Sequence, residues 1–453
     1  MKKHVRIIAL VLCVLCTVVF TAAGAETLIQ DFGPSVFVGY EDFLAKHPDV
    51  TVEHASVFYS NNTELSAAIL TETIRDDLFR LGTSFFDVRP IMEKGYLVDL
   101  SSYPEIVNAV SRMYPRIREQ CMVDGKIYGW PHFTDFDYIK VRPDTWAYTG
   151  SAEADMPTSC EGILDWIAWW VDKAEAEDIQ DVSVFDVHGY QYDKTSYPHL
   201  LTNIALQSHI LQQQYAGGAL SFSDPKLREI LIRCKELGDR LAQQEVPRGE
   251  DDLIVYHIVF EGGGGGFLPA DMKFIPSRLT DDQPKLLDAS VAIAVIPSTS
   301  QHKELAAALL CSIASGEEVF PTGRNVFLFA DLPAPLDPQY EARKAELEAN
   351  IADLEKTIAK EKEKGKSTAA LEQDLEVEQR CLNKLSQYLV SPEMLEAYRA
   401  MADGLYFAPP SVFWGRSEDV AAFDSLKEQY AAGSITVDEL LSRLNEMARM
   451  IQA

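Results

Sequence analysis

Aromatic rings and carboxylates are interleaved in one stretch of the chain, between residues 130 and 146. These residues are Trp130, Phe133, Asp135, Asp137, Tyr138 and Trp146. A sugar ring has apolar C–H faces and a rim of hydroxyl groups, so flat aromatic rings beside carboxylates are the groups that would bind it. The alternative is that the rings pack in a core while the aspartates face solvent. The stretch is therefore a candidate ligand site.

Two further aromatic segments could contribute to the same kind of site. Tyr192 lies in a polar, tyrosine-rich loop that extends from Gly189 to Tyr197, and the alternative is an ordinary surface loop. Tyr406 and Trp414 flank a proline-containing segment near the C-terminus, where packing in a core is the alternative.

The sequence offers no pattern for catalysis or for binding a metal or cofactor. The nine histidines are isolated, and no H-E-x-x-H or G-x-S-x-G occurs. The five glycines from Gly262 to Gly266 are not followed by the lysine of a phosphate loop, so they predict a flexible loop. With 69 acidic residues, no carboxylate pair of a glycosidase can be chosen. We predict a protein that is not an enzyme, with no metal and no cofactor.

The N-terminus has the pattern of a secretory signal peptide. Lys2, Lys3 and Arg6 precede an apolar run from Ile7 to Phe20, and small residues end at Ala25, where we expect cleavage. Cys13 and Cys16 lie inside the apolar run without a lipoprotein pattern. We expect an extracytoplasmic protein: secreted, periplasmic or held at the cell surface.

Composition narrows the class of partner. The net charge is −28, which should repel nucleic acid and anionic lipid. Five cysteines remain in the mature chain, and their spacing follows no regular disulfide pattern: Cys121, Cys160, Cys234, Cys311 and Cys381. We therefore expect that disulfides are not the main source of the fold's stability. A chain of 453 residues with 47% hydrophobic residues exceeds what one core usually serves, which predicts two lobes.

Strand and helix patterns alternate along the chain, which is typical of α/β layering. Strands are predicted at 50–54, 77–81, 254–260 and 290–296. Helices are predicted at 160–176, where Trp166, Trp169 and Trp170 should pack in a core, and at 223–244 and 303–314.

Residues 340–390 differ from the rest in being rich in Glu, Lys, Ala and Leu. Leucine and isoleucine at heptad spacing on both sides of 364–367 predict a protruding antiparallel helical hairpin. The chain then ends in an amphipathic helix that begins with a capping box from Thr436 to Glu439.

Three segments resemble the extracellular solute-binding proteins of ABC importers, in the sugar-binding group that includes maltose-binding protein. They are Asp77–Leu78–Phe79 through Gly95–Leu100, then Asp124–Gly125–Lys126–Ile127–Tyr128–Gly129–Trp130–Pro131, and finally Ala292–Ser315 with Gly433–Ile451. Together they cover roughly a third of the chain, and they are spread over nearly its whole length.

The resemblance implies a two-lobed α/β fold of the periplasmic-binding-protein type (type II), into which the helical hairpin is inserted. Lobe 1 would comprise 26–130 and 286–325, and lobe 2 would comprise 131–285 and 326–453, with the hairpin at 340–390. A solute, expected to be a sugar or oligosaccharide, would be trapped by hinge closure and passed to a membrane permease. We expect a monomer that binds no nucleic acid.

The resemblance also implies positions for the site. Asp135 matches a carboxylate that accepts hydrogen bonds from sugar hydroxyls, and Trp414 matches a ring that stacks on a pyranose. Thr83 and Ser84 replace an aromatic shelf after Leu81, and Cys160 stands where the family has a tryptophan. With Trp130, Asp137, Tyr138, Tyr192 and Tyr406, these residues complete the predicted ligand site.

Peptide, amino-sugar and modified-sugar ligands remain open, as do two other classes of function. An exported hydrolase or lyase would use the same aromatic cleft with an added acid and base. A surface interaction protein would keep the two lobes but act through the helical hairpin.

Overall fold

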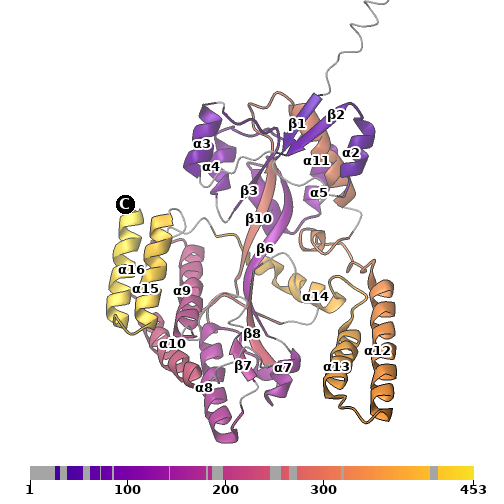
Figure 1. Cartoon of the computed structure of the whole chain (residues 1–453). Coiled ribbons are helices and arrows are strands. Elements are labelled where there is room, and N and C mark those ends of the chain that lie inside the picture. The colour runs from indigo at the N-terminus through magenta and orange to yellow at the C-terminus, as the bar shows by residue number, and fades with distance from the viewer. Residues whose placement is uncertain are drawn as a thin grey trace, which may run out of the picture.

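The computed structural model describes residues 26–30, 38–54, 62–71, 73–83, 86–141, 143–179, 182–185, 197–244, 257–264, 273–317, 321–408 and 417–452. Figure 1 shows two groups of helices and strands, one above the other, connected by the long strands β6 (Trp130–Val141) and β10 (Leu287–Val295). The predicted signal peptide lies outside these residues. Within the described ranges, we find no helix whose length and hydrophobicity would let it cross a bilayer.

The first lobe is built around one hydrophobic core that draws on both halves of the chain. Its strands are β1 (Glu26–Gln30), β2 (Val50–His54), β3 (Phe79–Gly82), β4 (Met122–Val123), β5 (Lys126–Ile127), β10 and β11 (Leu405–Tyr406). Its helices are α2 (Tyr40–Lys46), α3 (Asn62–Leu70), α4 (Val88–Glu93), α5 (Pro104–Ser111), α6 (Pro115–Arg118), α11 (Lys303–Glu317) and α14 (Pro392–Met401), with short 3-10 turns η2 (Glu119–Cys121), η5 (Asn325–Phe327) and η6 (Ala402–Gly404).

The second lobe has a separate core, formed mainly by helices. Its helices are α7 (Pro143–Tyr148), α8 (Cys160–Glu177), α9 (Tyr197–Ala216), α10 (Pro225–Gln244), α15 (Ser417–Ala431) and α16 (Val437–Gln452), with the turn η3 (Glu153–Asp155). Its strands are β7 (Val182–Phe185), β8 (His257–Gly264) and β9 (Lys273–Ile275). The predicted helices and strands of this region are thus confirmed, with ends that differ by a few residues.

A seven-stranded sheet runs through both lobes. Its main path is β11-β10-β6-β8-β7, with β3 on β10 and β9 on β6. The first part of β6 is antiparallel to β10, and its last part is antiparallel to β8. Trp130, at one end of β6, belongs to the first core, whereas Val141, at the other end, belongs to the second. One continuous strand therefore links the two lobes.

The chain crosses between the two cores three times. It leaves the first core at Trp130, returns from the second core between Leu279 and Leu287, and leaves again after Leu405 to reach Phe423. The first crossing is β6 itself, and the third includes residues 409–416, which lie outside the described ranges.

The strand β6 follows a tight hairpin made by the Asp124–Gly125 turn. Asp124 has φ 51° and Gly125 has φ 77°, so both central residues have positive φ, as in the turn that joins two-residue β-hairpins. The hairpin pairs β4 with β5. The segment that carried the strongest resemblance therefore forms this hairpin and only then enters the crossing strand.

The division of the chain into lobes differs from the prediction. Buried residues from Val326 to Leu332 and from Val390 to Leu405 pack in the first core, although the prediction placed 326–453 in the second lobe. Tyr398 fixes this arrangement, because it is fully buried and its hydroxyl donates a hydrogen bond of 2.9 Å to the carbonyl of Phe327. After the first core, the next helix that packs in the second core is α15. A hydrophobic pattern indicates that a helix is buried but not in which core.

The five glycines also differ from the prediction of a loop. Gly262, Gly263 and Gly264 are part of β8 and pair with Ile139, Tyr138 and Asp137 of β6. Gly265 and Gly266 lie outside the described residues. Glycine lowers the stability of a strand but does not prevent pairing, and it lets backbones approach closely.

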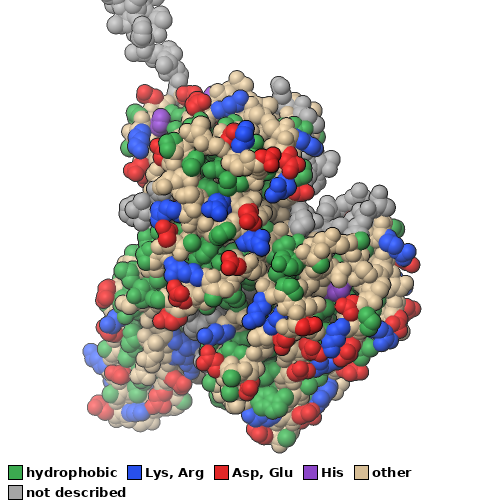
Figure 2. All heavy atoms as spheres, turned by 180° about the vertical axis from the view of Figure 1, so that it is seen from behind, with side chains coloured by type: hydrophobic (Ala, Val, Ile, Leu, Met, Phe, Trp, Pro, Cys, Tyr) green, Lys and Arg blue, Asp and Glu red, His purple; other side chains and the backbone are tan. Residues whose placement is uncertain are grey.

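Residues 340–384 form two helices that lie side by side, away from both lobes (Figure 1). They are α12 (Tyr340–Glu363) and α13 (Ala369–Lys384). The leucines of both helices and Ile351 are half-buried, and Ile358 is buried, whereas Val377 is exposed. Figure 2 shows acidic and basic side chains mixed over the face seen from behind, so the excess negative charge is not gathered in one patch on that face.

The helix α8 buries most of its tryptophans but not all of them. Trp166 and Trp170 are buried in the second core, as predicted. Trp169 is 43% exposed, which corrects the prediction that it packs in the core. The Lys173 ammonium lies over its ring, 5.2 Å from the centroid.

The helix α16 begins with the predicted capping box. The Thr436 hydroxyl accepts a hydrogen bond of 3.2 Å from the Glu439 N–H, and the Glu439 carboxylate accepts one of 2.7 Å from the Thr436 N–H. Its apolar stripe, which includes Leu440, Leu444 and Ala448, packs in the second core.

Candidate functional site

Four strands meet at one level of the sheet, at the position where the chain crosses between the lobes. Asp288 of β10 pairs with Asp137 of β6 and with Tyr406 of β11, and Asp137 pairs in turn with Gly264 of β8. Segments that are far apart in sequence are thus aligned in one row. Two residues predicted for the ligand site, Asp137 and Tyr406, lie in this row.

The burial pattern of β10 shows which face of the sheet is covered. Leu287, Ala289 and Val291 are buried in the first core, whereas Asp288 and Ser290 are only half-buried. Successive residues of a strand alternate between the two faces, so Asp288 and Ser290 belong to the more open face. Asp135 is in register with Ser290, two residues along β6 from Asp137. The backbone positions of Asp135 and Asp137 are therefore in register with Ser290 and Asp288.

An aromatic pair joins the two lobes beside this face. The ring of Tyr406 packs edge-on against Tyr215, at the end of α9, with a centroid distance of 5.5 Å and an interplanar angle of 84°. Tyr215 is 46% exposed and Tyr406 is half-buried, so part of each ring remains open to solvent. Burial raises the pKa of Tyr406, and the negative charge of Asp288 raises it further. We call Tyr406, Tyr215 and Asp288 the crossing cluster.

Tyr215 was not predicted as a site residue. It follows three glutamines at the end of a helix, and nothing in that local pattern distinguishes it from a surface tyrosine. It lies beside Tyr406 because the folded chain brings the end of α9 next to β11. No local sequence pattern predicts this contact.

Two other predicted residues lie in the first lobe, away from open solvent. Trp130 is 0% exposed and packs 6.2 Å from Phe329. Thr83 is also buried, and its hydroxyl accepts a hydrogen bond of 3.0 Å from the Val291 N–H. Both side chains therefore pack within the first lobe and are not open to a ligand.

The remaining predicted residues are described in part or not at all. The backbone of Asp135, Asp137 and Tyr138 is described as part of β6. Ser84, Tyr192 and Trp414 lie outside the described residues, and so their role stays a prediction.

Two buried ionisable side chains at the first half of β6, Glu317 and His132, are uncharged at neutral pH. Burial raises the pKa of Glu317, at the end of α11, to about 8, although the nearby Trp130 indole and the Arg324 charge act in the opposite direction. Burial lowers the pKa of His132 to about 3, and the positive charges of Arg80 and Arg324 add to this. His132 is the extra residue where the β6–β10 register shifts, a bulge that bends the crossing strand.

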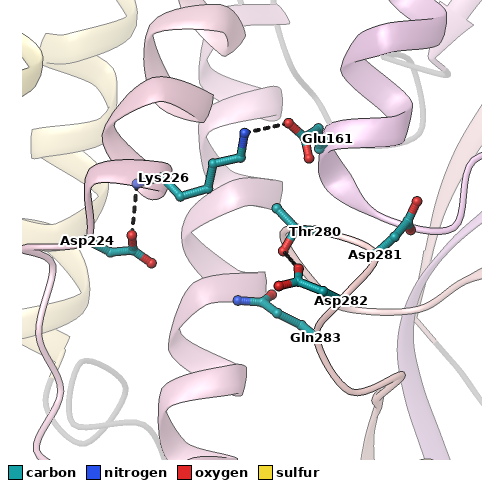
Figure 3. Close-up of a pocket in the computed structure, with 7 residues that line it drawn as sticks. All are labelled: Glu161, Asp224, Lys226, Thr280, Asp281, Asp282 and Gln283. Atoms are coloured by element: carbon teal, nitrogen blue, oxygen red, sulfur yellow. Dashed lines mark hydrogen bonds and ion pairs between the residues drawn. The ribbon is translucent and has the colours of Figure 1, made fainter.

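A polar pocket of about 540 Å3 has a lining that includes none of the crossing-cluster residues. Figure 3 shows its lining, which comes from the starts of α8 and α10 and from the loop 280–283. Two of its carboxylates form ion pairs: Glu161 contacts Lys226 of the lining at 2.6 Å, and Asp281 contacts Arg278 at 2.8 Å. Its lining contains no aromatic ring, so it lacks what a sugar face requires.

Within the described residues, no three or more His, Cys, Asp or Glu side chains are grouped in a way that could hold a metal ion. The crossing cluster consists of two rings and a carboxylate, together with the neighbouring positions of Asp135 and Asp137. Such an arrangement can stack against apolar ring faces and accept hydrogen bonds from hydroxyl groups.

Comparison with known proteins finds no matching family model and no matching curated protein. Solved structures do match over nearly the whole chain. A cyclic alpha-maltosyl-1,6-maltose binding protein from Arthrobacter globiformis aligns with a TM-score of 0.53 and 14% identity, covering 94% of this chain and 98% of that one. An ABC transporter solute binding protein from Agrobacterium vitis with bound D-mannitol aligns with a TM-score of 0.51 and 15% identity, covering 94% and 98%.

A third such protein, from Thermotoga lettingae and bound with alpha-D-tagatose, aligns with a TM-score of 0.50 and 14% identity, covering 94% of this chain and 100% of that one. At this level of identity the similarity concerns the fold. The chain therefore has the two-lobed α/β fold of these solute-binding proteins, and the predicted fold class is confirmed.

Proposed function

We propose that this chain is an exported solute-binding protein that captures a sugar or oligosaccharide between its lobes and delivers it to an ABC permease without altering it. The observation that carries the proposal is the fold shared over 94% of the chain with proteins of that kind, together with a row of strands that joins the two cores at the candidate site. Export is supported by the predicted signal peptide, and capture requires only one copy of the chain.

The crossing cluster suits such a ligand. Tyr406 and Tyr215 approach each other from different cores, so a ring that contacts both would hold the lobes together. Aromatic contacts of this kind contribute roughly 0.5–1.5 kcal/mol beyond the area they bury. Asp288, with Asp135 and Asp137 in the adjacent positions of β6, would accept hydrogen bonds from the hydroxyl rim. Trp414 is proposed to add a stacking surface from the third crossing.

Closure would be a hinge motion about the three crossings. Hinges are formed by a few residues that absorb changes in backbone angles while the packed cores move as units. β6 joins two cores that have separate sets of buried residues, so a bend within it changes the angle between the lobes without disturbing either core.

The proposed function is tested by a thermal-shift screen of the purified chain against sugars, oligosaccharides, amino acids and short peptides. A ligand that binds only the folded state raises the melting temperature. We expect a sugar to raise it and to be recovered intact, which would separate capture from hydrolysis or lyase activity. The appearance of cleaved product would favour the exported enzyme instead.

Variants locate the site once a ligand is found. Tyr406→Ala and Asp135→Ala should each weaken sugar binding by roughly 1–3 kcal/mol, the scale of a lost stacking contact or charge-assisted hydrogen bond. Tyr148→Ala is the matched control, because Tyr148 is 52% exposed and ends α7, at the far end of the second lobe in Figure 1. Deletion of the two hairpin helices, residues 340–384, should leave binding unchanged, because these helices contribute to neither core. Loss of binding in the deletion but not in the point variants would favour an interaction protein that acts through the hairpin.

A further inference from the structure

Two buried thiols meet in the core of the second lobe. Cys160 is the first residue of α8 and is 4% exposed, and Cys234 lies in the middle of α10 and is 0% exposed. Both cysteines belong to the same buried core, and the Cys234 thiol donates a hydrogen bond of 3.4 Å to the Leu201 carbonyl. Burial raises the pKa of the Cys234 thiol, and the neighbouring Cys160 thiol raises it further. The other described cysteines are elsewhere: Cys121 and Cys311 pack with the first core, and Cys381 is exposed on α13.

Contacts on either side hold the two helices in this register. Arg233, next to Cys234, contacts both Asp165 at 2.5 Å and Glu161 at 4.0 Å, and Glu161 follows Cys160 directly. Lys226, two turns earlier on α10, reaches the same Glu161 carboxylate at 2.6 Å (Figure 3). The backbone of Cys160 is fixed as well, because its N–H donates to the Arg278 carbonyl at 2.9 Å. The two helices are therefore held against each other with both cysteines in their shared core.

We propose that Cys160 and Cys234 form a disulfide bond that ties α8 to α10. The oxidant is a small-molecule or protein disulfide of the kind found outside the cytoplasm. A thiolate of one cysteine attacks this disulfide to give a mixed disulfide and one free thiol, and the second cysteine then displaces the remaining thiol. In sum, two S–H bonds are lost and one S–S bond is formed, while the oxidant takes up two electrons and two protons to become two thiols.

The burial of the pair sets when the bond forms. Burial raises the pKa of the Cys234 thiol well above its usual range, so the folded, reduced protein should react slowly. A chain that folds in an oxidising compartment meets the oxidant before α8 and α10 have docked, and docking brings the two sulfur atoms together. The bond in the cell therefore rests on the proposed export, since a cytoplasmic chain would keep its thiols reduced.

The test is made on the purified chain in the absence of any sugar, so its outcome is independent of the proposed ligand. The reduced chain is unfolded and refolded in a buffer of reduced and oxidised glutathione. It is then unfolded again in guanidinium chloride with excess iodoacetamide, so that every free thiol is accessible, and digested without reductant for mass spectrometry. We expect one cross-linked pair of peptides, containing Cys160 and Cys234, with a mass lower by two hydrogen atoms than the sum of the free peptides. Cys121, Cys311 and Cys381 should carry the alkyl group.

Two variants serve as controls. Cys160→Ala should leave Cys234 fully alkylated, whereas Cys381→Ala should leave the cross-link intact. The oxidised chain should also melt at a higher temperature than the reduced chain, because the bond restricts the unfolded state. Alkylation of both Cys160 and Cys234 in the refolded wild-type chain, or a cross-link of either to another cysteine as the main product, would overturn the proposal.

Discussion

Replacing Glu317 by glutamine should remove a pH dependence of stability that originates beneath the crossing strand. Glu317 is 7% exposed at the end of α11, and burial raises its pKa from the ordinary 4.5 to about 8. Between these two pH values the folded chain keeps a proton on this carboxyl that the unfolded chain releases. The free energy of unfolding must therefore fall as the pH rises from about 4.5 to about 8.

The size of the effect follows from the same values. Each tenfold difference in proton affinity is worth about 1.4 kcal/mol, so a difference between 4.5 and about 8 corresponds to roughly 3–5 kcal/mol. Glu317→Gln cannot release a proton, and its own cost or benefit is the same at every pH. The variant should thus gain stability relative to wild type by that amount between pH 4.5 and pH 8.

The assay is urea unfolding followed by circular dichroism at several pH values across this window. Other groups also titrate there: burial lowers the pKa of His199 and of His209, which makes stability rise with pH and partly hides the effect in wild type alone. The difference between wild type and variant isolates Glu317. Glu304→Gln, at an exposed position of the same helix, is the control. Parallel curves for wild type and Glu317→Gln would refute the reasoning.

Three further predictions concern the crossing strand, the site and a helix end. Gly129→Ala, just before β6, should lower the free energy of unfolding by roughly 1–3 kcal/mol, because an added Cβ would lie 2.4 Å from the Ile293 Cγ2 atom; an unchanged urea midpoint would contradict it. Tyr215→Ala should weaken binding of the sugar found in the thermal-shift screen by roughly 5–150-fold in Kd, measured by calorimetry, whereas Trp169→Ala should leave Kd unchanged. Thr436→Ala should cost about 1 kcal/mol by removing the cap of α16, and Thr436→Ser should restore most of it.

The sequence predicts much of this fold, because the features that specify it are local. The alternation of β-branched and polar residues predicts β2, and the capping box predicts where α16 begins. Two lobes follow from the length of the chain, since one core rarely serves so many residues.

What the sequence does not predict depends on which buried surfaces meet. The contact of Tyr398 with Phe327, 71 positions earlier, is not predicted by any local pattern, and it belongs to the packing of this segment in the first core. Gly262 has no side chain to indicate a strand, and it pairs because β6 supplies an unpaired edge. Tyr215 becomes a site candidate only through Tyr406, which lies 191 positions later in the chain.

The central claim is that the two lobes close on a sugar and leave it unchanged. Small-angle X-ray scattering of the purified chain, with and without the sugar that raises its melting temperature, tests this most directly when the sugar is recovered and analysed afterwards. The account predicts a smaller radius of gyration with the sugar bound, no such change for Tyr406→Ala at the same sugar concentration, and intact sugar at the end. An unchanged radius of gyration at saturating sugar, or recovery of a cleaved product, would contradict it.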